Sequence, residues 1–109
     1  MLPNGHEAIV EERKLRDYVL NVGHPVGRHH ATLFRELVGI GVSNLELLRT
    51  ALLRAAESES VTREVRTPHG AKYEIRFECE GQRGTRRVRA VSIINEHETR
   101  PRLVTYFVE

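Results

Sequence analysis

The sequence predicts an α+β fold in which N-terminal helices precede an antiparallel β-sheet of about four strands. Apolar residues recur at helical spacing through about residue 58, and from Val61 onward the apolar period changes from about 3.6 to 2. Turn-forming residues separate the alternating segments, so successive strands are expected to pair. At 109 residues the chain is expected to be one domain, with a helical half at about 1–58 and a sheet half at about 59–109.

Two helices are expected first, from about Glu11 to Asn21 and from about Arg28 or His29 to Val38. Glutamates in the first turn of the earlier helix oppose its dipole, and glycines follow the end of both helices. The expected apolar stripes are Leu15, Tyr18, Val19 and Val22 in the first helix, and Ala31, Phe34, Leu37 and Val38 in the second.

A third helix is expected to begin at a capping box, Ser43-Asn44-Leu45-Glu46, and to run to about Ala56. Its inward positions are predicted to be Leu45, Leu48, Leu52 and Ala55. Ahead of all three helices, Ala8-Ile9-Val10 is a short apolar segment with the character of an isolated strand.

Four segments of the second half have the alternation of strands. Thr67-Pro68-His69-Gly70 and the glycine-containing segment 80–84 are expected to be turns, and 95–101 a loop. Cys79, the single cysteine, is expected to be a small buried residue of a strand, and it excludes an internal disulfide. The expected strands are Val61–Arg66, Lys72–Cys79, Arg86–Ile94 and Arg102–Val108.

Charge is unevenly distributed along the chain. The net charge is +2, and fifteen of the seventeen cationic residues are arginine, whose planar fork suits phosphate. Arg83, Arg86, Arg87 and Arg89 fall within seven residues. This group predicts either a patch for nucleic acid or an acidic partner, or a solvated hairpin whose charges protect a sheet edge.

The expectations for localisation and cofactors rest on sequence patterns that the chain does not contain. No apolar run approaches the ~20 residues of a membrane span, and no signal-peptide pattern stands at the N-terminus, so a cytoplasmic protein is expected. No nucleotide-binding glycine loop is present, and the spacing of His24, His29 and His30 does not complete a known zinc site. No metal and no cofactor are expected.

The segment His24-Pro25-Val26-Gly27-Arg28-His29-His30 contains three of the six histidines beside an arginine and a Pro/Gly turn. Histidine exchanges protons near neutral pH, so this loop is a candidate acid–base site. The structural alternative is a helix–helix turn in which His24 caps the preceding helix.

Three segments carry a resemblance that covers nearly the whole chain. They are Lys14-Leu15-x-x-Tyr18-x-Leu20, then His24-Pro25-x-Gly27-Arg28 with Phe34, then Pro101-Arg102-Leu103-Val104-Thr105-Tyr106-Phe107. Together they resemble a family of small bacterial proteins classed as a domain of unknown function. The chain departs from that family at His30, where lysine is usual, and at Ser92, where an aromatic residue is usual. The departure at position 30 bears on any cationic role there.

The layout is similar to that of the barnase, EndoU, colicin-type and RelE ribonucleases, which place helices before a four-stranded sheet. That similarity implies metal-free RNA cleavage by a bacterial toxin, with a histidine from the helical half and a Ser/Thr or basic residue from the last strands. Such a toxin implies an acidic inhibitor protein as a partner.

Residues are assigned to this chemistry by type and position. His24 is the candidate acid or base, and Arg28 and Lys14 are candidate phosphate-stabilising cations. Gly27 would let a phosphate approach a helix N-terminus, and Thr105 would orient it. The candidate substrate-binding residues are Tyr106, Arg86 and Arg87.

Strand alternation complicates the assignment at the last strand. It predicts that Thr105 shares a face with Leu103 and Phe107, and that Tyr106 faces the other way with Val104 and Val108. Thr105 and Tyr106 therefore cannot both line one surface. Two other functions remain open at this point: a non-catalytic module that binds nucleic acid or protein through its arginines, and an accessory or inhibitor subunit.

Overall fold

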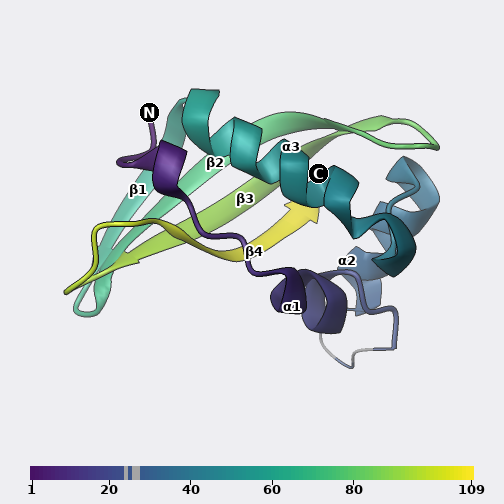
Figure 1. Ribbon diagram of the computed structural model, residues 1–109, viewed down its shortest axis with the longest axis horizontal. Coiled ribbons are helices and arrows are strands. Elements are labelled where there is room, and N and C mark those ends of the chain that lie inside the picture. Colours follow the sequence, from purple (N-terminus) through teal and green to yellow (C-terminus); the bar gives the residue numbers. More distant parts are fainter. Residues whose placement is uncertain (24, 26–27) are drawn as a thin grey trace.

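The sheet is an antiparallel meander, as the alternating segments predict. The computed structural model describes residues 1–23, 25 and 28–109, without the side chains of Tyr18 and Phe107. Within this part the strands pair in chain order, β1-β2-β3-β4, and each pair is antiparallel (Figure 1). The strands are β1 (Val61–Thr67), β2 (Gly70–Glu80), β3 (Thr85–Asn95) and β4 (Arg102–Val108).

The helices precede the sheet and pack on it, which confirms the α+β class. α3 crosses one face of the sheet, and α1 and α2 lie at one end of it, where α2 contacts β4 (Figure 1). None of the described helices is long and apolar enough to cross a membrane. The helical segments are η1 (Gly5–Glu7), α1 (Glu12–Lys14), η2 (Leu15–Val19), α2 (Arg28–Leu33), η3 (Phe34–Val38), η4 (Val42–Asn44) and α3 (Leu45–Ser58).

Both early helices end in a π-helical turn, and this changes which residues are buried. The Leu20 amide donates to the Leu15 carbonyl at 2.8 Å, a bond to the fifth residue back rather than the fourth. The wider turn brings Leu20 into the core and leaves Val22 45% exposed. The prediction that Val22 belongs to the apolar stripe is therefore wrong. In the second helix Ala31, Phe34 and Val38 are buried as predicted.

α3 has the predicted inward face but a different start. Leu45, Leu48, Leu52 and Ala55 are all buried against the sheet. The predicted capping box between Ser43 and Glu46 is wrong, because the start of α3 has no side-chain cap hydrogen bond, and Asn44 instead holds the turn that precedes it. The Asn44 side-chain oxygen accepts from the Gly41 amide at 2.7 Å, and its side-chain nitrogen donates to the Gly39 carbonyl at 2.8 Å.

The N-terminal segment runs along the outer edge of β4. Ile9 forms a parallel bridge with Arg102, in which the Ile9 amide donates to Pro101 at 2.8 Å and the Leu103 amide donates to Ile9 at 3.0 Å. Asn4 and Arg100 add side-chain hydrogen bonds between the same two stretches. The expected isolated strand is thus a single bridge that covers one edge of the sheet.

β4 contains a bulge that changes which residues share a face. Val91 pairs with Thr105 and the next residue, Ser92, pairs with Leu103, so β4 carries one extra residue between these pairs. The bulge places Leu103 on the same covered face as Tyr106, and both are buried. The predicted grouping of Leu103 with Thr105 is therefore wrong, because a single extra residue reverses the alternation.

The main core lies between the covered face of the sheet and the helices. It unites apolar residues of the helical half with the inward positions of the three later strands. Cys79 lies within it, fully buried as expected. The opposite face of the sheet carries no helix and is called the open face below; it includes Lys72, Glu74, Arg76, Glu78, Arg87, Arg89, Val91 and Thr105.

Candidate functional site

The candidate residues of the helical half lie at its surface. Lys14 ends α1 and is half-buried, and Arg28 is the exposed first residue of α2. Neither side chain forms an ion pair with a described residue. His24 and Gly27, the proposed acid–base group and phosphate approach, lie outside the described residues.

Thr105 lies half-buried on the open face, opposite Val91. α2 contacts both η2 and β4, so the helix that begins at Arg28 adjoins the strand that carries Thr105. Lys14 directly precedes η2, the segment on which α2 also packs. α2 therefore contacts both the segment that follows Lys14 and the strand that carries Thr105, whose side chain lies on the face of the sheet without helices.

Tyr106 is a core residue, which corrects its assignment as a substrate-stacking group. It is 1% exposed, and its ring meets that of Phe34 edge-on, with centroids 5.7 Å apart and an interplanar angle of 74°. Its hydroxyl has no hydrogen-bond partner among the described residues. Burial, and to a lesser degree Cys79, raises the pKa of this hydroxyl. The β4 bulge turns this side chain to the covered face, away from any substrate on the open face.

The arginines of the open face are matched by carboxylates. The Glu74 carboxylate lies 3.4 Å from an Arg76 nitrogen and 4.0 Å from an Arg89 nitrogen, and the Glu74 side chain is only 13% exposed. Arg76 also pairs with Glu109 at 2.7 Å. Charge on this part of the sheet is therefore largely balanced within the protein.

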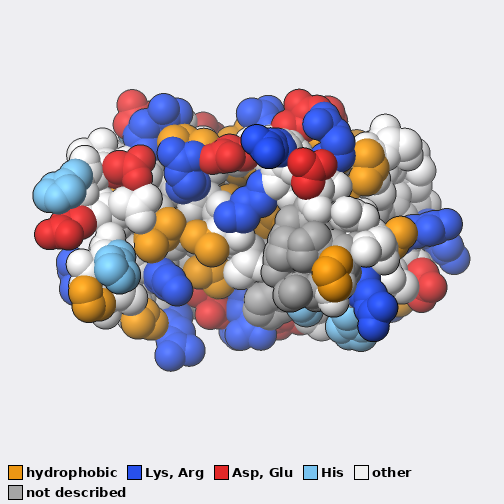
Figure 2. Space-filling model, turned by 90° about the horizontal axis from the view of Figure 1, so that it is seen from below, with side chains coloured by type: hydrophobic (Ala, Val, Ile, Leu, Met, Phe, Trp, Pro, Cys, Tyr) orange, Lys and Arg blue, Asp and Glu red, His pale blue; other side chains and the backbone are white. Residues whose placement is uncertain are grey.

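The arginine-rich hairpin does not form one continuous basic patch. Arg86 pairs with Cys79 in register and so belongs to the covered side, whereas Arg87 pairs with Glu78 on the open side. Both are exposed at the strand start, and neither forms an ion pair with a described residue. In Figure 2, which shows one face of the molecule, Lys and Arg side chains are interspersed with acidic ones.

A groove at the end of the helical half gathers two further arginines. It has a volume of about 480 Å³ and lies between η3, the linker to α3 and the β2–β3 turn. Arg35 and Arg83 line it together with Ser43, Asn44 and Gln82, and none of its described lining residues is acidic. Sequence reasoning missed Arg35, because in sequence it is one more exposed charge on a helix, far from Arg83.

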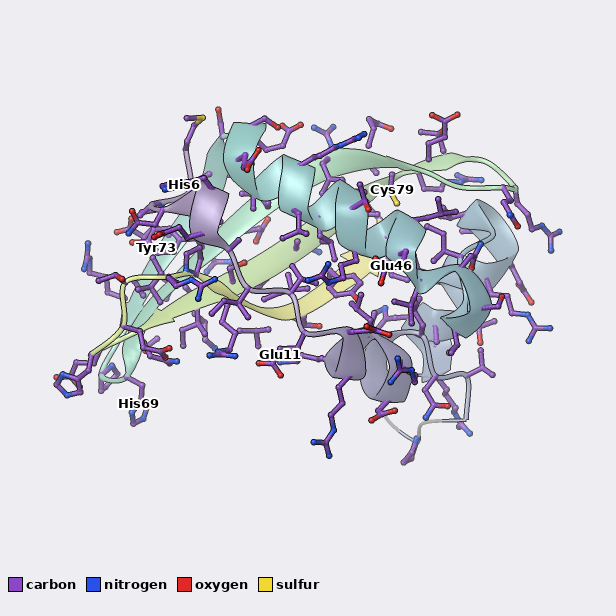
Figure 3. The ribbon with its side chains drawn as sticks, viewed as in Figure 1. His6, Glu11, Glu46, His69, Tyr73 and Cys79 are labelled. Atoms are coloured by element: carbon purple, nitrogen blue, oxygen red, sulfur yellow. The ribbon has the colours of Figure 1, made fainter. Side chains whose placement is uncertain are left out.

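Of the remaining described histidines, two lie far from the helical end of the molecule and two lie in α2. Figure 3 shows His69 at the tip of the β1–β2 turn and His6 beside the N-terminal end of the chain, both away from α2. His29 and His30 lie in α2 with ring centroids 5.7 Å apart, and the Nδ1 atom of His30 is buried. Among the described residues no group of three or more His, Cys, Asp or Glu side chains has the arrangement of a metal site.

Comparison with known proteins identifies the family but no activity. No curated protein and no solved structure matches the chain. One family model matches it over residues 1–109, which is the whole sequence. The chain therefore belongs to the family described as a domain of unknown function, DUF6883.

Proposed function

We propose that this protein is a metal-independent endoribonuclease of the bacterial toxin type. In the proposed reaction the 2′-hydroxyl oxygen of a ribose attacks the adjacent phosphorus, and the bond from phosphorus to the 5′-oxygen breaks. His24 takes the 2′-hydroxyl proton as a base and returns a proton to the leaving 5′-oxygen as an acid. The products are a 2′,3′-cyclic phosphate and a free 5′-hydroxyl.

Arg28 and Lys14 stabilise the negative charge that grows on the non-bridging phosphate oxygens in this proposal. The observation that carries it is the contact of α2 with β4, together with the absence of an ion-pair partner for Arg28 among the described residues. An arginine at the start of a helix gains nothing from the helix dipole there, so its exposure without a counter-charge favours an external anion. Gly27 gives the phosphate access to the backbone, and Thr105 orients it.

The test is cleavage of total RNA and of a tRNA pool by purified protein in the presence of EDTA, with analysis of the product ends. His24→Ala is expected to abolish cleavage, and Arg28→Gln to lower its rate by about a hundredfold, the effect typical of removing one stabilising donor. Arg66→Gln is the matched control, because Arg66 lies on β1, at the far edge of the sheet, and pairs with Glu64 at 3.3 Å. Its rate should stay within about twofold of wild type.

Two outcomes would contradict the proposal. One is unchanged cleavage by His24→Ala, which would assign the activity to a different group or to a contaminant. The other is an absence of cleavage by wild-type protein at high concentration.

A non-catalytic nucleic-acid-binding module is the second candidate. It is favoured by Arg83, Arg86 and Arg87, which are exposed and form no ion pair with described residues. This function predicts RNA binding that weakens steeply with salt and produces no cleavage. Replacing Arg86 and Arg87 with glutamine should then weaken binding far more than His24→Ala does. For either function, an acidic protein that covers these cations is the expected inhibitor.

A further inference from the structure

We propose that the groove between η3 and the β2–β3 turn binds a phosphate group of the RNA substrate, outside the site of cleavage. The identity of the ligand as RNA rests on the function proposed above. The binding of phosphate rests on the groove itself. Arg35 and Arg83 are its recognition residues, and the exposed valines of the groove support the adjoining nucleoside.

The elements that carry the two arginines are joined by a backbone hydrogen bond. The Arg83 amide donates to the Val38 carbonyl at 2.9 Å, which fastens the β2–β3 turn to the end of η3. Gly39 makes this contact possible, because it has a φ of 84° and a Cβ atom there would lie 2.7 Å from the Arg83 nitrogen. Since Arg35 belongs to η3, the bases of both side chains are positioned relative to each other before any ligand arrives.

Three polar acceptors at the groove already receive hydrogen bonds from the protein. The Val38 carbonyl accepts from Arg83, the Gly39 carbonyl accepts from the Asn44 side chain, and the Asn44 oxygen accepts from the Gly41 amide. Neither guanidinium forms an ion pair with a described residue. The donors of Arg35 and Arg83 are therefore available to an external anion, and no described carboxylate of the groove competes with it.

The chemistry of the lining selects phosphate attached to an apolar or aromatic group. A guanidinium fork matches the oxygens of a phosphate in a bidentate contact. Val22 and Val42, 45% and 44% exposed, supply apolar surface in the same groove. Neutral donors stand beside the arginines in Ser43 and Gln82. A nucleotide unit has both the charged and the flat apolar part that these residues accommodate.

Two residues that line the groove lie close to the candidate acid–base group in the sequence. Leu20 and Val22 line the groove and stand four and two residues before His24 in the sequence. We therefore expect a phosphate held by Arg35 and Arg83 to belong to the same RNA strand that is cleaved. Binding energy at such a remote position supports the reaction by orienting the scissile bond.

The test is direct binding of a fluorescent single-stranded 2′-O-methyl RNA, which has no free 2′-hydroxyl and cannot be cleaved. Anisotropy titrations at several salt concentrations compare wild type with Arg35→Gln and Arg83→Gln. Each substitution is expected to weaken binding by about tenfold and to reduce the slope of log K against log salt by about 0.7, the value for one lost contact to a single strand. At position 83, glutamine keeps the Cβ and Cγ atoms, which in Arg83 lie against Gly39.

Two further variants control for charge and for folding. Arg54→Gln removes the same charge from α3 beside a different groove, which contains Glu59, Glu78 and Glu80, and it should retain the wild-type slope. Val42→Glu leaves both arginines in place but adds a carboxylate at an exposed position of the groove. Val42→Glu should weaken binding at least as much as Arg35→Gln does. Its Tm should stay within about 2 °C of the wild-type value.

The outcomes separate this inference from the ribonuclease proposal. Binding that depends on Arg35 and Arg83 without any cleavage of ordinary RNA would support the groove and contradict the enzyme. Binding that is indifferent to both arginines and to Val42→Glu, or no binding by wild type, would overturn the groove whatever the cleavage assay shows. Calorimetry with inorganic phosphate and with a nucleoside 5′-monophosphate identifies the source of the phosphate. A free nucleotide that binds as tightly as the oligomer would overturn RNA as the ligand.

Discussion

The two faces of the sheet differ in how their ionisable groups are accommodated: one buries neutral groups, and the other pairs charged ones. On the covered face, Cys79 and Tyr106 are buried among apolar side chains, and both are held in their neutral forms. On the open face, the Arg76 and Arg89 side chains are paired with the Glu74 carboxylate. One face thus excludes charge and the other balances much of it, and further arginines without an ion pair among the described residues lie at the rim, where α2 begins and where the β2–β3 turn packs on η3. The contrast locates the surfaces where an anionic ligand meets uncompensated arginines.

The covered face should lose stability at alkaline pH. Burial raises the pKa of the Cys79 thiol from 9.0 to about 11. Between these values the unfolded chain has released a proton that the folded chain still holds, so the free energy of unfolding falls as pH rises from about 9 to 11. The fall is expected to be about 2 to 3 kcal/mol from this group, and burial of Tyr106 acts in the same direction.

Urea unfolding at pH 7, 8.5 and 10.5 measures this fall. Cys79→Ala removes the titrating thiol, so its stability should decline less over the same range, whatever its stability at pH 7. An equal decline in both proteins would show that the thiol is not excluded from water and would weaken the contrast between the faces.

Removing the balancing carboxylate should convert part of the open face into an anion-binding surface. Glu74→Gln leaves Arg76 and Arg89 without the side chain that pairs with both. We expect a loss of about 1 kcal/mol in the free energy of unfolding and a several-fold tighter, more salt-dependent affinity for single-stranded RNA. Glu78→Gln is the matched control, because it removes the same charge from β2 at an exposed position without an ion pair among the described residues.

Equal gains in RNA affinity from Glu74→Gln and Glu78→Gln would argue that net charge alone governs binding. The pairing on the open face would then have no role in masking its arginines. Thermal unfolding and anisotropy on the same samples distinguish the two cases.

The last expected effect, which is confined to stability, concerns the hydroxyl of Tyr106. Because this hydroxyl is buried without a partner among the described residues, Tyr106→Phe should raise the free energy of unfolding by about 1 kcal/mol. Cleavage or RNA binding should remain unchanged. A loss of stability in urea unfolding would instead reveal a hydrogen bond to this hydroxyl.

The parts of the fold that follow a strict local period were predictable. α3 buries one face, with buried residues mostly three or four positions apart, and β2 alternates buried residues with more exposed ones. Hydrophobic spacing alone therefore located this helix and this strand. The departures came from single-residue changes in hydrogen bonding. A π-helical turn after Leu15 and a bulge in β4 each shift the register by about one residue, and neither has a distinct hydrophobic pattern.

The candidate site was predictable only in its residue types. Arg28 and Thr105 were named from their positions in sequence, but the contact between the elements that carry them depends on the packing of α2 against β4. The groove was not predicted, because Arg35 and Arg83 are brought together by one hydrogen bond between η3 and the β2–β3 turn. Contacts between such distant segments have no local signal in a single sequence.

The bridge between Ile9 and the start of β4 also constrains the order of folding. Leu103 and Pro101 supply its hydrogen-bonding partners, so the bridge cannot form until the C-terminal strand has been synthesised. The hairpins of the sheet close over short separations, whereas this bridge closes a loop of more than ninety residues and carries the corresponding entropy cost. The bridge at Ile9 is therefore expected to form last and to open first. Amide exchange at Ile9 should report that opening ahead of global unfolding.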